Sequence, residues 1–173
     1  QTVALTEKSD TWINLHFDLE FLKDKKHFVW ASERDGFKHL YLYANNGQLI
    51  RQITAGDWVV DSLKGVDEKN GMVYFAARKD TALESHLYSA PLFKKGAIKR
   101  ITEKGQYHNV VLAKDNKTFI DTSSSVNKPN SAALRKINGE FITWLEENKL
   151  DDSHPLTPFL TDLAQPEYGT ITA

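Results

Sequence analysis

The sequence contains no cysteine, so disulfide bonds, thiolate chemistry and cysteine-based zinc sites are excluded. Its apolar runs are only a few residues long, far short of the roughly 20 that a transmembrane helix needs. The net charge of −1 gives no electrostatic basis for binding nucleic acid or an anionic membrane. What is present, 40% hydrophobic and 26% charged residues in a chain of 173, is typical of a globular protein that can bury a core.

Motifs of catalysis and cofactor binding are also missing. No Gly-x-Ser-x-Gly nucleophile elbow and no glycine-rich phosphate loop occurs, and the six histidines lack the spacing of a metal site. Ser123–Ser125 has ordinary loop composition, and the adjacent acids Glu146 and Glu147 are typical of a solvated turn. We therefore expect no catalytic residue, no metal and no cofactor in this chain, and we reject an independent hydrolase within it.

A repeat is the main feature of the sequence. The pairs Leu5-Thr6, Ile53-Thr54 and Ile101-Thr102 lie 48 residues apart, and an aromatic residue follows each pair. The tripeptides His39-Leu-Tyr41 and His86-Leu-Tyr88 lie between these pairs and are 47 residues apart. Periods of about 40 to 50 residues are typical of β-propellers, in which each repeat is a blade of four strands.

Each repeat divides into four short apolar runs separated by turn residues such as Asp35-Gly36 and Asn46-Gly47. The predicted blades cover residues 12–54, 58–102 and 107–144, within a propeller region 1–150. The predicted strands are Trp12–Leu15, His27–Ser32, His39–Tyr43, Leu49–Thr54, Trp58–Val66, Met72–Arg78, His86–Leu92, Ile98–Thr102, Tyr107–Leu112, Thr118–Ser123, Ala132–Ile137 and Glu140–Trp144. The sequence thus predicts an all-β fold, a partial β-propeller of about three four-stranded antiparallel blades in an open arc.

The two ends of the chain differ from the repeats. Thr2–Thr6 is predicted to be the last strand of a preceding blade. Residues 151–173 are rich in proline, which removes donors from strand ladders, so they are predicted to form an extended connector. Within the connector, Tyr168–Thr172 is predicted to form a strand. Within the third blade, Lys128–Asn130 is predicted to be a turn.

Several side chains have predicted roles within the blades. His39 and His86 occupy equivalent repeat positions, which favours a structural hydrogen bond over catalysis. The charged segment Glu33–Asp35 is predicted to be a surface turn, with contact to a neighbouring domain as the alternative. The tryptophans are predicted to pack between blades: Trp12, Trp30, Trp58 and Trp144. For Trp12 and Trp58, which open their units, the alternative is a position nearest the central channel or its rim.

The string Phe28-x-Trp30-x-Ser-Glu-Arg-x-Gly36-x-x-His-Leu-Tyr41, followed by Ile53-Thr54-x-Gly56-x-Trp58, resembles the propeller of bacterial dipeptidyl peptidase IV-like serine exopeptidases, of the prolyl oligopeptidase clan. In that family an eight-bladed propeller caps an α/β-hydrolase that removes X-Pro or X-Ala dipeptides. The resemblance implies that residues 1–150 are late propeller blades and that 151–173 lead into the hydrolase. It also implies that the Ser-Asp-His triad lies beyond Ala173 and the amine-binding glutamates before Gln1.

The resemblance implies one site residue. Trp12 matches a residue that lines the substrate pocket, so it is predicted to bind substrate. The implied function is that of a non-catalytic propeller fragment, which in the whole peptidase gates and helps bind peptide N-termini. The alternative is a self-standing propeller-like protein-interaction module.

The implied partners are a peptide substrate and the hydrolase domain of the same protein, without nucleic acid or a membrane span. The open arc leaves sheet faces bare, so the isolated chain is predicted to self-associate. The resemblance further implies a homodimeric parent protein, located in the bacterial periplasm, in the cell envelope or outside the cell.

Overall fold

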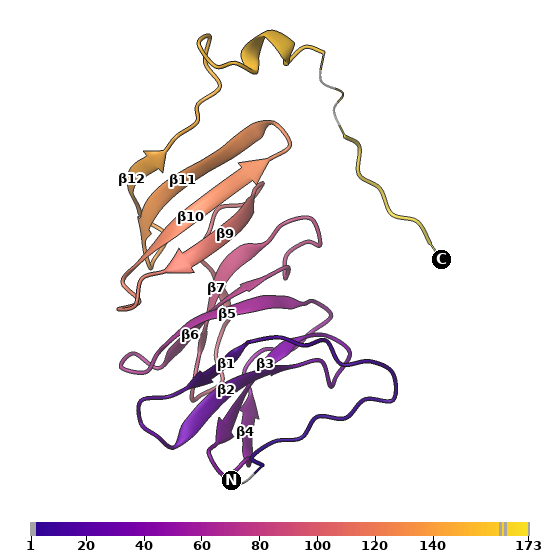
Figure 1. Ribbon diagram of the computed structural model, residues 1–173, viewed down its shortest axis with the longest axis vertical. Coiled ribbons are helices and arrows are strands. Elements are labelled where there is room, and N and C mark those ends of the chain that lie inside the picture. Colours follow the sequence, from indigo (N-terminus) through magenta and orange to yellow (C-terminus); the bar gives the residue numbers. More distant parts are fainter. Residues whose placement is uncertain (1–2, 163, 165, 173) are drawn as a thin grey trace.

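A computed structural model describes residues 3–162, 164 and 166–172 of the chain. The strands in these residues form three four-stranded antiparallel sheets that follow one another along the long axis of the molecule (Figure 1). In each sheet the strands are paired in the order of the sequence, so each sheet is a meander. The three sheets do not close into a ring, and the prediction of an all-β, partial β-propeller with three blades is confirmed.

The blades have the following bounds. Blade 1 consists of β1 (Leu19–Phe21), β2 (His27–Ser32), β3 (His39–Ala44) and β4 (Leu49–Gln52). Blade 2 consists of β5 (Val60–Asp67), β6 (Met72–Ala77), β7 (His86–Pro91) and β8 (Lys99–Arg100). Blade 3 consists of β9 (Tyr107–Leu112), β10 (Thr118–Ser125), β11 (Lys128–Lys136) and β12 (Phe141–Glu146). A short 3₁₀ helix, η1 (Thr157–Phe159), follows in the connector.

The hydrophobic core lies between the blades. Side chains alternate along β3, so that Leu40 and Leu42 pack toward blade 2 while Tyr41 and Tyr43 pack on the opposite face with Phe28. Between blades 1 and 2 these leucines join a cluster of fully buried side chains. Burying one such side chain contributes about 1.5–3 kcal/mol, so the face-to-face contacts of the sheets hold the arc together.

The interface between blades 2 and 3 repeats this arrangement with fewer residues. Tyr74 and Leu87 of blade 2 pack against Val110 and Phe119 of blade 3. At the turn between β11 and β12, Gly139 has a φ of 94°, and a Cβ there would lie 2.6 Å from the carbonyl oxygen of Ile101. Glycine is therefore required for blade 3 to approach blade 2 this closely.

A histidine and a threonine join β3 to the end of β4 in blade 1. The Nδ1 atom of His39 lies 3.1 Å from the hydroxyl of Thr54, and this hydroxyl also accepts a hydrogen bond from the Leu40 backbone N–H. The hydroxyl therefore donates its proton in a hydrogen bond to Nδ1 of the imidazole. The other ring nitrogen then carries the proton and donates to the carbonyl of Gly56, at 2.8 Å.

Blade 2 contains the same arrangement. The Nδ1 atom of His86 lies 3.0 Å from the hydroxyl of Thr102, which accepts from the Leu87 N–H, and Nε2 lies 2.8 Å from the Glu84 carboxylate. Both imidazoles are buried and bonded at each ring nitrogen. The predicted structural role of His39 and His86 is confirmed, and each imidazole bonds to a threonine that follows the last strand of its blade.

The prediction of Trp12–Leu15 as the first strand is wrong. The first strand is β1, and it pairs with β2 through Leu19 opposite Trp30, with Ala31 donating to the carbonyl of Asp18. Because β2 ends at Ser32, residues before Asp18 have no partner strand, despite their alternating apolar side chains.

Three further predictions at loops and ends also fail. Lys128–Asn130 is not a turn but the start of β11, because Ser125 pairs with Lys128 and the turn between them has only two residues. Of the predicted strand Thr2–Thr6, Thr2 lies outside the described residues, and the rest is irregular. Tyr168–Thr172 is extended but pairs with no strand in the described part of the chain, so no ladder forms.

We expect the threonine hydroxyl to be necessary for stability. Thr102→Val keeps the side-chain volume but leaves the Leu87 N–H and the His86 ring without their partner, which costs about 1–3 kcal/mol of the free energy of unfolding. Urea denaturation measures this loss. Thr143→Val, on the exposed strand β12, is the control and should change the free energy by less than about 0.5 kcal/mol. Equal stability of the Thr102 variant and the wild type would contradict this role.

The buried histidine also predicts a dependence on pH. Burial lowers the pKa of His86 below its ordinary value of 6.5, and the hydrogen bond to Glu84 offsets this only in part. Since the unfolded chain then binds the proton more readily, the stability that neutral His86 contributes is present above pH 6.5 and is lost as the pH falls below it. We expect the stability advantage of the wild type over His86→Gln to shrink between pH 8 and pH 5. An advantage that grows on acidification would contradict the assignment.

Candidate functional site

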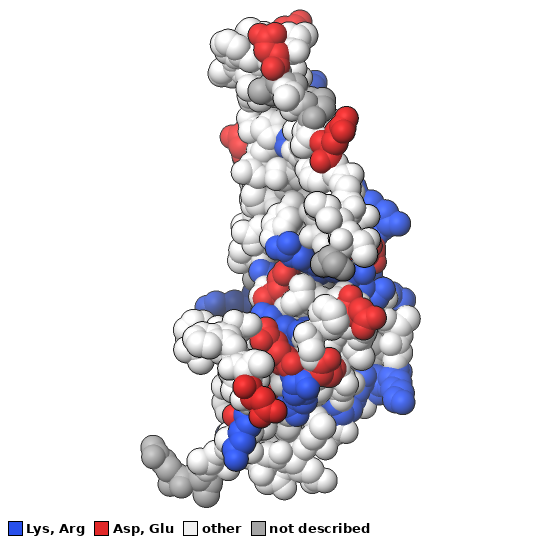
Figure 2. Space-filling view, turned by 90° about the vertical axis from the view of Figure 1, so that its right-hand side faces the viewer, with Lys and Arg blue, Asp and Glu red and all other residues white. Residues whose placement is uncertain are grey.

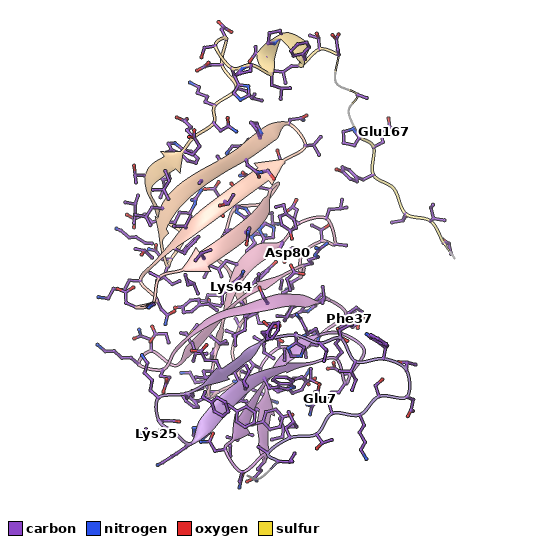
Figure 3. The ribbon with its side chains drawn as sticks, in the orientation of Figure 1. Glu7, Lys25, Phe37, Lys64, Asp80 and Glu167 are labelled. Carbon is purple, nitrogen blue, oxygen red and sulfur yellow. The ribbon has the colours of Figure 1, made fainter. Side chains whose placement is uncertain are left out.

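Antiparallel strands place the loops of the three blades on two opposite rims. The β2–β3 loop (33–38), the β6–β7 loop (78–85) and the β10–β11 turn (126–127) lie on one rim, here called the loop rim. Phe37 and Asp80 lie on this side of the molecule, and Lys25 of the β1–β2 turn lies on the other (Figure 3). In Figure 2, which faces the loop rim, acidic and basic side chains are interleaved, so neither sign of charge forms a continuous patch.

A cavity opens on the loop rim of blade 1. It has a volume of about 380 Å³ and lies between the irregular segment 5–16 and the residues Ser32, Glu33 and Arg34 at the end of β2. Trp12, the predicted substrate-binding residue, lines this cavity. Trp12 is 76% exposed, so the prediction that it packs between blades is wrong.

Arg34 fixes one end of the segment to the blade. Its Nη2 atom lies 3.1 Å from the Glu7 carboxylate, and its Nε donates to the Ser32 hydroxyl at 2.9 Å. The guanidinium lies over the Tyr41 ring, 4.5 Å from the centroid, which adds a cation–π contact. Glu7 is labelled on the N-terminal segment in Figure 3.

Glu33 fixes the other end through Asn14. The Asn14 amide donates to both carboxylate oxygens of Glu33, at 3.0 and 2.8 Å, and its carbonyl oxygen accepts from the Trp12 indole N–H at 3.1 Å. The adjacent residues Glu33 and Arg34 thereby hold segment 7–14, which we call the arch, at both of its ends. Sequence reasoning identified Glu33–Asp35 as a charged turn, but not its contact with the arch.

The other tryptophans lie outside this cavity. Trp58 packs between blades 1 and 2, with its ring 4.9 Å from His39 and 6.3 Å from Phe75, as the packing prediction requires. Trp30 is half-buried, 4.6 Å from the ring of His16. Trp144 lies on β12 with 36% of its surface exposed.

A charged network joins blades 1 and 2. The carboxylate of Asp18 accepts from the Leu63 backbone N–H at 2.8 Å and from the Lys38 ammonium at 2.9 Å. Lys38 also donates to the carbonyl oxygen of Asp61, whose carboxylate accepts from the Ser85 hydroxyl at 2.6 Å. Each of these polar groups has a hydrogen-bond partner within the network. The role of the network is therefore to link the two blades.

The structure brings a serine, a histidine and an aspartate together in blade 3, without making a catalytic triad of them. His108 and Asp121 form a buried pair at 2.8 Å, and Ser123 is the cross-strand neighbour of His108. However, the other nitrogen of His108 donates to the carbonyl of Glu103, and the Ser123 hydroxyl donates to Gln106. The histidine therefore has no free nitrogen to act as a base toward Ser123.

Other kinds of site are also missing from the described ranges. Residues 3–162, 164 and 166–172 contain no group of three histidine, aspartate or glutamate side chains that could hold a metal ion. Within the same ranges, no helix has the length and apolarity required to span a bilayer.

The stacked meanders, with their cores between successive sheets, define the chain as an arc of β-propeller blades. Residues 1–130 match the sequence pattern of the dipeptidyl peptidase IV (DPP IV) N-terminal region. The chain belongs to this family, and the resemblance noted in the sequence is confirmed.

Individual relatives agree with this assignment. Dipeptidyl peptidase 8 of Mus musculus is 31% identical over 167 residues, which cover 79% of this chain and 19% of that protein. Probable dipeptidyl-aminopeptidase B of Coccidioides posadasii is 31% identical over 160 residues, covering 84% of this chain and 16% of that protein. The crystal structure of Porphyromonas gingivalis dipeptidyl peptidase 4 aligns with a TM-score of 0.69 and 28% identity, over 77% of this chain and 18% of that one. The chain thus spans less than a fifth of the length of these relatives.

Proposed function

We propose that this chain is the non-catalytic propeller part of a dipeptidyl peptidase IV-like serine peptidase, in which it gates and helps bind peptide N-termini for release of X-Pro and X-Ala dipeptides. The observation that carries the proposal is the cavity with an exposed tryptophan on the loop rim of a chain from this family. In this proposal Trp12 forms a wall against which the peptide packs. The nucleophile, base and acid belong to a hydrolase domain encoded elsewhere in the protein.

The lack of catalytic geometry in the described residues supports the division of roles. The one serine that neighbours a histidine–aspartate pair is buried and bonded to Gln106, so it has no base. A wall without reactive groups contributes binding energy and excludes water, whereas bond breaking needs groups held elsewhere. The charged loops of the same rim offer the contacts by which the propeller meets its hydrolase domain.

The proposal includes partners and location. Exposed apolar side chains at both ends of the arc support self-association of the isolated chain: Phe17 and Leu19 before and in β1, and Val111 and Ile120 on blade 3. A homodimeric parent protein and a place in the bacterial periplasm, in the envelope or outside the cell complete the proposal, and they rest on the family resemblance.

The isolated chain should be inactive. Purified residues 1–173 should not release nitroaniline from Gly-Pro-p-nitroanilide, because no nucleophile and base face each other in the described structure. The product of the complete reading frame that contains this chain should release it. Hydrolysis by residues 1–173 would overturn the division of roles, and an inactive complete protein would favour a protein-interaction module.

The wall can be tested by removing it. In the complete peptidase, Trp12→Ala should raise KM for a tetrapeptide such as Gly-Pro-Gly-Phe by about fivefold, corresponding to ~1 kcal/mol of lost contact, while kcat stays unchanged. Phe17→Ala removes an exposed ring that does not line the cavity, and it should leave KM unchanged. Identical KM values for the Trp12 variant and the wild type would contradict a pocket role for Trp12.

A further inference from the structure

We propose that Glu33 is a positioning residue that orients the indole of Trp12 through Asn14, and thereby sets how the enzyme discriminates among peptides longer than a dipeptide. The inference extends the proposed function, because it assumes that Trp12 is a wall of the peptide pocket. Glu33 also lines the cavity, but in this proposal its effect on the peptide is indirect. It acts on the peptide only through the position of the arch.

Neither burial nor a strand ladder fixes the orientation of the Trp12 side chain. The Trp12 side chain is 76% exposed, so burial against the blade does not fix its orientation. The arch has no strand partner, and backbone ladders therefore do not fix it either. The specific contact of the indole is the hydrogen bond from Nε1 to the Asn14 carbonyl oxygen, at 3.1 Å.

Asn14 is fixed in turn by Glu33. A side-chain amide accepts at its oxygen and donates at its nitrogen, so it can pass an orientation from one group to another. Here the nitrogen donates to both oxygens of the Glu33 carboxylate, at 2.8 and 3.0 Å. A charged acceptor makes the stronger type of hydrogen bond, so the carboxylate determines which way the amide faces. The indole is then oriented by a charge on the neighbouring hairpin.

The hairpin is a firm base for this contact. Ser32 ends β2 and is buried, and the next residue but one, Arg34, is held by the Ser32 hydroxyl and the Tyr41 ring. Arg34 also binds Glu7 at the far end of the arch. Glu33 lies between these two neighbours, so both ends of the arch are attached to adjacent residues just after β2. Trp12 lies two residues before the Asn14 attachment.

This arrangement assigns separate effects to the two tethers. The Arg34–Glu7 pair keeps the arch on the blade, whereas the Glu33–Asn14 contact determines the direction of the indole. Loss of Glu33 should therefore leave the fold and the chemical step intact and loosen the wall. The expected functional change is a higher KM for tetrapeptides, with an unchanged kcat and unchanged hydrolysis of Gly-Pro-p-nitroanilide, which does not extend past the dipeptide far enough to reach the wall.

The orientation itself can be measured by NMR on ¹⁵N-labelled residues 1–173. The indole N–H resonance of Trp12 is identified by its loss in Trp12→Phe. Glu33→Ala should shift this resonance and leave those of the other three tryptophans in place. In Glu33→Gln the resonance should stay close to its wild-type position, because the glutamine carbonyl still accepts from Asn14. Asp35→Asn is the matched control: it neutralises an acid of the same turn, whose carboxylate binds Gln52, and it should shift none of the four.

Kinetics of the complete peptidase then connect orientation to specificity. Glu33→Ala should raise KM for Gly-Pro-Gly-Phe about three- to fivefold, and Glu33→Gln and Asp35→Asn should stay within about twofold of the wild type. An unshifted Trp12 resonance in Glu33→Ala overturns the positioning role. A shifted resonance with an unchanged KM overturns the specificity role while Trp12→Ala still raises KM, and an unchanged KM in Trp12→Ala refutes the pocket role itself.

Discussion

The packing of each sheet against the next is the constraint on which the rest of the structure depends. A four-stranded meander with apolar side chains on both faces cannot be stable alone in water, and it becomes stable when neighbours cover those faces. In β7 nearly every residue is buried because its side chains serve the interfaces with both neighbouring blades. In β3 nearly every residue is buried because Leu40 and Leu42 face blade 2, while Tyr41 and Tyr43 pack with Phe28, Leu5 and Trp30 on the other face. The buried His–Thr pairs and the Asp18 network also lie along these interfaces, so polar groups that are taken from water find partners there.

Much of this could be predicted from periodicity. The repeat of 48 residues and the turn residues between apolar runs gave the three blades and ten of their strands closely, since those signals depend on local side-chain alternation and turn chemistry. The failures are of another kind. Ile13, Leu15 and Phe17 alternate with polar residues as in a strand, but β2 is too short to pair with this segment. A segment forms a strand only when a neighbouring strand is long enough to pair with it. The length of that neighbour cannot be deduced from the sequence of the segment itself.

The candidate site shows the same limit. Trp12 was predicted from a family resemblance, and the structure places it beside a cavity, but its packing between blades was predicted wrongly. Its tethers Asn14 and Glu33 are 19 residues apart and belong to different elements, so no spacing rule connects them. The Ser123, His108 and Asp121 cluster was missed for the same reason, and only hydrogen-bond geometry shows that it has no catalytic use.

The row of blades has a consequence for how the molecule comes apart. Blade 2 has a neighbour on each face, whereas blades 1 and 3 each have one, so the chain behaves as a short linear array with nearest-neighbour coupling. In such an array opening begins at the termini and the middle unit is lost last. Backbone amides of β6 and β7 are therefore the slowest to exchange with solvent, and the arc frays from its ends before it melts.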